Sequence, residues 1–112
     1  MTLLPLVLFH KKQQLWICWD VDRNAPMGGL ITEIITDEKH PEKVFLSIPL
    51  VGGEEWNKWG DVLWSLIKVW GIEKGCTHAL GYGRRGWTRW YGFVEFGTTD
   101  GGLPMFVRTL KR

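Results

Sequence analysis

A pair of glycines between an apolar segment and an amphipathic segment is the feature of this sequence most able to do chemistry. Gly52 and Gly53 follow an expected strand and directly precede an expected helix. Backbone N–H groups at a helix start lie unpaired at the positive end of the helix dipole, so they can bind the phosphates of a cofactor. The expected anion site comprises the residues around this pair: Leu50, Val51, Gly52, Gly53 and Glu54.

Two arginines extend this prediction. Arg84 and Arg85 begin a short helix expected at residues 84–90. A cation at a helix N-terminus is mildly unfavourable, so a nearby anion held by charge-assisted bonds would explain the pair. The alternative is that both arginines are solvated surface residues.

Other site chemistries find little support. The sequence contains no Ser/His/Asp nucleophile set, no metal-ligand cluster and no Walker loop, so we expect no metal. Cys18 and Cys76 are far apart and lack metal-ligand spacing, which favours buried free thiols in a reducing cytoplasm.

Length and charge narrow the class of protein. The chain has 112 residues, which suits one domain, and a net charge of +2, too small to indicate a nucleic-acid partner. The apolar run at residues 3–9 is short and contains Pro5, so we expect neither a signal peptide nor a membrane span. We therefore expect a cytoplasmic protein without a membrane or nucleic-acid partner.

The elements that must position the glycine pair form a mixed α/β (α+β) sheet. Strands are expected at residues 3–9, 15–19, 28–36, 43–51, 76–82, 92–97 and 103–110, with a long helix at 54–74. An antiparallel meander is followed by strand–helix–strand–helix–hairpin, with a parallel crossover through the long helix. Pro49 predicts a bulge or a splay near the end of its strand. A ligand in such a sheet is expected beyond the carboxyl end of the strand that enters the helix.

Tryptophan is unusually frequent, with eight in the chain. The long helix carries an apolar stripe that we expect to be core: Trp56, Trp59, Leu63, Leu66, Ile67 and Trp70. Trp64 lies off this stripe and is predicted to contact a partner.

The order of these elements resembles the GCN5-related N-acetyltransferase (GNAT) fold, and most closely the small GNAT-like proteins of tailed bacteriophages. The resemblance covers roughly residues 15–110. It rests on five motifs in the same order: Ile31-Thr32-Glu33-Ile34, Val51-Gly52-Gly53, Glu54-Glu55-Trp56, Gly75-Cys76 and Gly83-Arg84-Arg85-Gly86-Trp87.

The resemblance implies a phage protein in the cytoplasm of an infected host. It would bind acetyl-CoA and transfer the acetyl group to an amine of a host protein or metabolite. In the family the strand before the long helix splays from its neighbour, the pantetheine arm lies in the gap, and backbone amides at the helix start hold the pyrophosphate. Residues 1–112 would form one GNAT-like domain lacking most of the family's first strand and two helices. We expect a homodimer, because such a sheet leaves apolar area and strand edges to cover.

The sequence also departs from the family. The family's pyrophosphate loop reads Arg/Gln-x-x-Gly-x-Gly/Ala, whereas acidic Glu54 and Glu55 follow the glycines here. Thr88 occupies the position where many members have a tyrosine acid, and Tyr91 directly precedes Gly92.

The catalytic residues are therefore left open, and the candidate acid–base groups are Glu33, His78 and Tyr82. Two alternatives also stay open. One is a catalytically inactive GNAT-like module that binds and modulates a host protein through tryptophan-rich surfaces, and the other is a virion accessory protein with the same fold.

Overall fold

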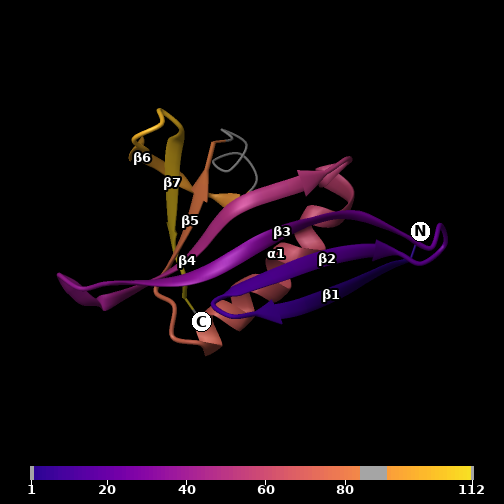
Figure 1. Ribbon diagram of the computed structural model, residues 1–112, viewed down its shortest axis with the longest axis horizontal. Coiled ribbons are helices and arrows are strands. Elements are labelled where there is room, and N and C mark those ends of the chain that lie inside the picture. Colours follow the sequence, from indigo (N-terminus) through magenta and orange to yellow (C-terminus); the bar gives the residue numbers. More distant parts are fainter. Residues whose placement is uncertain (1, 84–90, 112) are drawn as a thin grey trace.

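A seven-stranded sheet carries one helix on one face in the computed structural model, which describes residues 2–83 and 91–111 (Figure 1). The sheet order is β1-β2-β3-β4-β5-β7-β6. The elements are β1 (Leu3–His10), β2 (Gln13–Asp20), β3 (Ala25–Asp37), β4 (His40–Gly53), α1 (Trp56–Glu73), β5 (His78–Tyr82), β6 (Val94–Thr98) and β7 (Pro104–Thr109). The predicted mixed sheet is confirmed, because β1 to β4 pair antiparallel and β4 pairs parallel with β5 through the α1 crossover.

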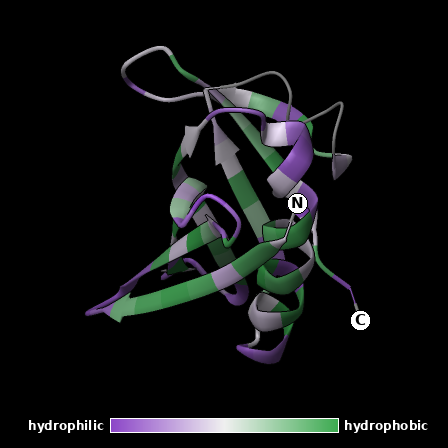
Figure 2. Cartoon of the chain, turned by 90° about the vertical axis from the view of Figure 1, so that its right-hand side faces the viewer, coloured by the Kyte–Doolittle hydropathy of each residue, from purple (hydrophilic) through white to green (hydrophobic). Residues whose placement is uncertain are grey.

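The meander begins with two apolar strands joined by a tight turn. Strand β1 is almost continuously hydrophobic and ends in a hydrophilic turn (Figure 2). Lys11, in the left-handed region with φ 55°, and Lys12 alone connect β1 to β2, so no helix lies between them. Residues 3–10 therefore form the strand that the sequence predicted at residues 3–9.

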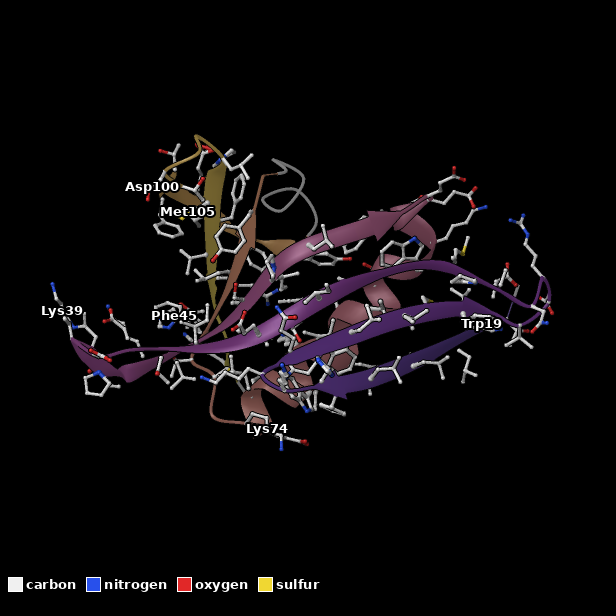
Figure 3. All side chains as sticks on the ribbon, viewed as in Figure 1. Trp19, Lys39, Phe45, Lys74, Asp100 and Met105 are labelled. Atoms are coloured by element: carbon white, nitrogen blue, oxygen red, sulfur yellow. The ribbon has the colours of Figure 1, made fainter. Side chains whose placement is uncertain are left out.

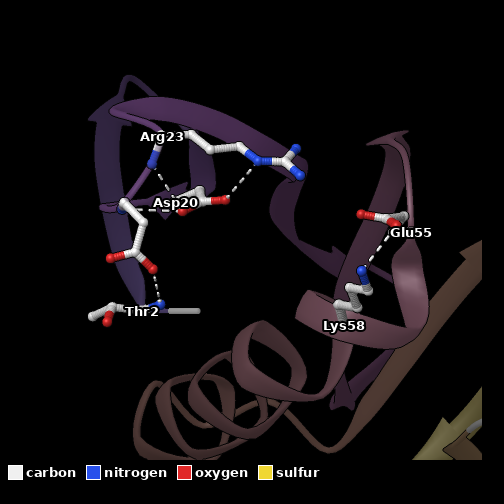
Figure 4. Close-up of polar contacts among 6 residues, drawn as sticks. Thr2, Asp20, Arg23, Glu55 and Lys58 are labelled. Carbon is white, nitrogen blue, oxygen red and sulfur yellow. Dashed lines mark hydrogen bonds and ion pairs between the residues drawn. The ribbon is translucent and has the colours of Figure 1, made fainter.

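The next turn is organised by one buried carboxylate. Asp20 is only 3% exposed and accepts backbone N–H bonds from Asp22 (3.1 Å) and Arg23 (3.2 Å) (Figure 4). The Arg23 Nε lies 3.6 Å from the same carboxylate. Asp22 in turn accepts the N–H of Thr2 at 2.9 Å. These bonds satisfy the buried carboxylate and tie the start of the chain to the β2–β3 turn.

Helix α1 begins at Trp56, two residues later than the sequence predicted. Glu54 and Glu55 are therefore not in its first turn, and Glu55 is the N-cap residue with a left-handed backbone (φ 54°). The helix face that packs on the sheet contributes Trp59, Leu63 and Ile67 to the core. None of the helices in the described part of the chain is long and apolar enough to cross a membrane.

The predicted assignment of two helix side chains is wrong. Trp64, expected at a partner surface, is 8% exposed and stacks on Tyr91 at 5.2 Å, while Leu66, expected in the core, is 43% exposed. The reason is that α1 is covered on two sides, by the sheet and by residues 91–93. The buried face of α1 therefore includes Trp59, Leu63 and Ile67 of the predicted stripe and adds Trp64, whereas the sequence prediction assumed one covered side.

The sequence prediction for Pro49 is confirmed in both of its forms. Between the pairs Ile31↔Leu50 and Glu33↔Ser47, β4 has two residues opposite one of β3, which is a β-bulge containing Pro49. Pairing of β4 with β5 ends at Ile48↔Gly81, whereas β4 continues alongside β3 as far as Gly53. The two parallel strands visibly diverge beyond this point (Figure 1).

Candidate functional site

The divergence of β4 from β5, which we call the fork, is the natural centre of a site. It begins after Ile48↔Gly81, at the carboxyl ends of two parallel strands and directly before the helix that β4 enters. Ligands of open α/β sheets bind at such places. Pro49 has no N–H with which to continue a ladder, and beyond the bulge β4 pairs with β3 alone.

Two hydroxyl groups meet at the fork, on the sheet face opposite α1. Ser47 is 3% exposed, and its Oγ donates a 3.3 Å hydrogen bond to the phenol oxygen of Tyr82. Glu33 is the cross-strand partner of Ser47 on β3. Of the three predicted acid–base candidates, Glu33 and Tyr82 therefore lie on either side of the same serine.

The third candidate lies apart from the other two. His78 is four residues before Tyr82 on the same strand face, which corresponds to about 13 Å along β5. Its Nδ1 lies 2.7 Å from Thr77 Oγ1, and its ring centroid is 5.4 Å from that of Phe45. The geometry thus groups Glu33 with Tyr82 and leaves His78 at the other end of β5.

The glycine pair ends the strand rather than forming a loop. Gly52 and Gly53 pair with Gly29 and Gly28 of β3, so the connection to α1 consists of Glu54 and Glu55 alone. Gly53 has φ 124°, and a Cβ there would lie 2.5 Å from the Cα of Gly28. A Cβ at Gly52 would meet nothing within 4 Å. Gly53 is therefore required by packing, while Gly52 is open to a ligand.

Both glutamates at the helix start are exposed. The Glu55 carboxylate pairs with Lys58 Nζ at 2.9 Å, as Figure 4 shows, and the Glu54 carbonyl accepts the indole N–H of Trp59 at 2.6 Å. Lys58 offsets one negative charge, and Glu54 retains the other. The remaining predicted phosphate ligands, Arg84 and Arg85, lie outside the described residues, so the anion site at residues 50–54 stays a prediction.

An aromatic cluster packs the first turns of α1 against residues 91–93. Trp56, Trp59, Trp64, Tyr91 and Phe93 form edge and stacked ring contacts with centroids 4.7 to 5.9 Å apart. The cluster lies on the helix side of the sheet, opposite the hydroxyl groups of the fork.

Within this cluster, the hydroxyl of Tyr91 donates a 3.1 Å bond to Asp61 Oδ1. Burial, reinforced by the Asp61 carboxylate, raises the pKa of Tyr91 well above its usual range. Tyr91 therefore retains its proton in the hydrogen bond to Asp61.

The sequence did not predict a role in the site for Ser47 or for the Tyr91–Asp61 pair. Neither a serine within an expected strand nor a tyrosine before a glycine forms a catalytic motif, and only the β4–β5 register places Ser47 beside Tyr82. No sequence periodicity relates Asp61 to Tyr91, so their contact could not be predicted from the sequence either.

Solved structures similar to this chain include acetyltransferases. The Ard1 protein of Thermoplasma volcanium matches with 12% identity and a TM-score of 0.65, over 88% of this chain and 71% of that protein. A GNAT-family acetyltransferase of Listeria monocytogenes 4b F2365 matches with 13% identity and a TM-score of 0.60, over 88% of this chain and 64% of that protein. The N-terminal domain of a ribosomal-protein-alanine acetyltransferase from Clostridium acetobutylicum ATCC 824 matches with 11% identity and a TM-score of 0.52, over 93% and 95%.

No protein-family model matches this sequence, and no curated protein does. At such low identities the structural likeness shows the fold alone. The chain therefore has a GNAT-like fold, as its sequence predicted.

Proposed function

We propose that this chain is an acetyltransferase-like protein that binds acetyl-CoA at the fork and transfers the acetyl group to an amine. The observation that supports this function is the end of β4–β5 pairing at Ile48↔Gly81, beside the Pro49 bulge, in a GNAT-like fold. Beyond this pair the facing edges of β4 and β5 have backbone amide groups that no longer bond each other. Such groups suit the amides of a pantetheine arm.

The phosphates would lie at the start of α1, where unpaired N–H groups and the helix dipole favour an anion. Gly52 has no side chain to cover these amides, and a Cβ there would meet no atom within 4 Å apart from its chain neighbours. The exposed Glu54 carboxylate opposes an approaching phosphate, which lowers the expected affinity. Arg84 and Arg85, outside the described residues, would add favourable charge.

Bound acetyl-CoA would supply an acetyl thioester. The side chains of this protein would orient the reacting thioester and amine and transfer the protons. Glu33 would accept the proton that the amine loses as the C–N bond forms, and Tyr82 would donate a proton to the departing thiolate sulfur as the C–S bond breaks. Ser47 would orient the Tyr82 hydroxyl. Pro49 has no N–H, so the donor that polarises the carbonyl would be a neighbouring strand amide.

Calorimetric titration with acetyl-CoA tests the binding step. We expect micromolar binding, much weaker binding of acetyl-pantetheine, which lacks the phosphates, and opposite effects of two substitutions. Gly52→Trp should fill the open position and weaken binding, whereas Glu54→Gln should strengthen binding by removing a repulsive charge. If the wild-type chain shows neither heat nor a melting shift at millimolar acetyl-CoA, the proposal is wrong.

The bacteriophage origin, and an acceptor on a protein or metabolite of the infected host, are proposed from the sequence resemblance. Incubating the protein with acetyl-CoA and a bacterial lysate, followed by mass spectrometry for newly acetylated amines, tests the acceptor. A Tyr82→Phe sample serves as the control for non-enzymatic acetylation. Equal labelling by both proteins would contradict enzymatic transfer.

A second proposal, a binding module without chemistry, rests on a different observation. The face of β1 to β4 opposite α1 has no cover in the described structure, and leucines dominate it. They are Leu4, Leu6, Leu8, Leu15 and Leu50, each between 38% and 59% exposed. The described tryptophans are buried or half-buried, so this surface is leucine-rich and not tryptophan-rich. Exposed apolar patches of this kind commonly mark protein interfaces.

A host protein or a second copy of the chain could occupy this leucine-rich face. Analytical ultracentrifugation of the wild-type protein and of Leu6→Asp distinguishes between these two possible partners. A concentration-dependent dimer abolished by Leu6→Asp would support the homodimer. A wild-type monomer that captures a host protein, with capture lost in Leu6→Asp, would support the module. A wild-type monomer that captures no protein would contradict both.

A further inference from the structure

A groove of about 860 Å³ lies on the sheet face opposite α1, across β4, β5, β7 and β6. This volume is typical of sites that hold small molecules. The apolar part of its lining comes from all four strands: Phe45, Leu80, Val94, Phe96, Met105 and Val107. Figure 3 labels Phe45 and Met105, which stand near its two ends. Val94 and Phe96, at 64% and 53% exposed, leave the side of the groove along β6 open.

One end of the groove is cationic. His78 of β5 pairs with Phe45 of β4 on one side and with Thr109 of β7 on the other. Lys43 lies two residues before Phe45 and Lys111 two residues after Thr109, and both line the groove. Because β5 runs parallel to β4 and antiparallel to β7, the two lysines extend beyond the same end of β5. Both side chains therefore border the His78 end of the groove, and Lys111 also lines a second pocket beside Lys68 and Glu73 of α1.

No acidic residue is among the described residues that line the groove. The neighbouring Glu42 carboxylate lies 3.6 Å from His40, outside the lining. Arg108 contributes to the wall, but its guanidinium points to the helix side. Its Nη1 donates to the Tyr91 carbonyl at 2.8 Å, and its Cζ lies 5.4 Å from the Trp64 ring centroid. The positive charge available to a ligand is therefore concentrated at the Lys43–Lys111 end.

We infer that this groove binds a free single-chain carboxylate, that is, a fatty acid. The carboxylate would lie between Lys43 and Lys111, near His78, and the alkyl chain would run over Leu80 and Val107 toward Met105. The distance from His78 to the level of Tyr82 and Met105 is about 13 Å, which accommodates an extended alkyl chain. The apolar wall excludes strongly polar anions, and the cationic end disfavours cationic amphiphiles. The inference does not rest on the proposed acetyl-CoA binding, and the far end of the groove lies at the level of Tyr82, on the same sheet face as the fork.

Two amphiphiles of equal chain length and opposite charge test the inference. Decanoate and decyltrimethylammonium are titrated, below their micellar concentrations, into protein carrying ¹³C-methyl methionine. We expect the Met105 methyl signal to move with decanoate, with an affinity at least tenfold higher than that for the cation. Met27 is the internal control, because it packs on the hydrophobic core and its carbonyl lies near Gly53, at the far end of β4 from Phe45.

Charge-reversal variants test whether Lys43 and Lys111 bind the carboxylate head group. Lys43→Glu combined with Lys111→Glu should weaken decanoate binding at least tenfold and reverse the preference between the two amphiphiles. The matched control, Lys12→Glu with Lys74→Glu, makes the same change in net charge at exposed positions outside the groove and should leave binding unchanged.

Three results would each overturn the fatty-acid site. They are equal binding of the two amphiphiles, equal weakening by both double variants, and an unmoved Met105 signal at millimolar decanoate.

Discussion

The Oγ of Ser47 donates a 3.3 Å hydrogen bond to the phenol oxygen of Tyr82, at the level where β4 and β5 cease to pair. The two residues are 35 positions apart and are brought together by the parallel crossover through α1. Because Ser47 is buried and sits on a strand, it fixes the orientation of the tyrosine hydroxyl. The pair therefore places a proton donor at the point where the proposed thioester would lie.

Tyr82→Phe should lower the kcat of acetyl transfer by up to about 100-fold, because it removes the proposed acid. Ser47→Ala should have a smaller effect, about tenfold, because it removes only the group that orients the phenol. The KM for acetyl-CoA should stay the same in both. Thiol release in the presence of a panel of small amines measures these values. Tyr91→Phe is the control, and loss of activity there but not in Tyr82→Phe would transfer the acid role to Tyr91.

The two glycines at the end of β4 should respond differently to alanine. Gly53→Ala should lower the free energy of unfolding by about 2 kcal/mol, because the new Cβ would overlap the Gly28 backbone and φ is positive. Gly52→Ala should be neutral or slightly stabilising, because its Cβ enters open space. Urea denaturation of the two variants measures the difference. Equal destabilisation would mean that β4 does not continue beside β3 to Gly53.

The raised pKa of Tyr91 should lower the free energy of unfolding at alkaline pH. Its pKa in the folded protein is raised by burial and by Asp61, so the folded state retains a proton that the unfolded chain releases near pH 10. This contribution is complete below about pH 10 and is lost as the pH rises further. Tyr91→Phe should therefore lose less stability than the wild type as the pH rises above about 10.

Thermal or urea unfolding across that pH range compares the two proteins. Burial also raises the pKa values of the Cys18 and Cys76 thiols, which act in the same direction, but both proteins share them. The difference between the proteins therefore isolates Tyr91. Parallel pH curves would show that Tyr91 titrates normally in the folded state.

Removing the hydroxyl of Thr32 should be strongly destabilising. The Trp16 indole N–H donates to Thr32 Oγ1 at 2.9 Å, and that hydroxyl donates to Gln14 Oε1 at 2.7 Å, all in buried surroundings. Thr32→Val leaves a buried donor and a buried acceptor without partners, so we expect a loss of about 2 kcal/mol. The exposed Thr109→Val control should change stability by less than about 0.5 kcal/mol. A Thr32→Val effect as small as that of the control would contradict the buried relay.

Local patterns in the sequence were sufficient for the order of elements. Apolar strands, the polar turns between them and one long amphipathic helix predicted the meander, the parallel crossover and the final hairpin, and Pro49 indicated both the bulge and the splay. These features depend on interactions between residues close together in the chain, or on the missing N–H of proline. Interactions of such short range can be predicted from the sequence without knowledge of the tertiary structure.

The tertiary structure alone decided which side chains meet. Trp64 is buried and Leu66 exposed because residues 91–93 cover a second side of α1, which no periodicity along the helix can indicate. Ser47 lies beside Tyr82 because of the parallel register of β4 and β5, and a shift of one residue would place the two on opposite faces. The sequence by itself determined the elements and the place of the fork, whereas long-range register and packing determined the groups that face it.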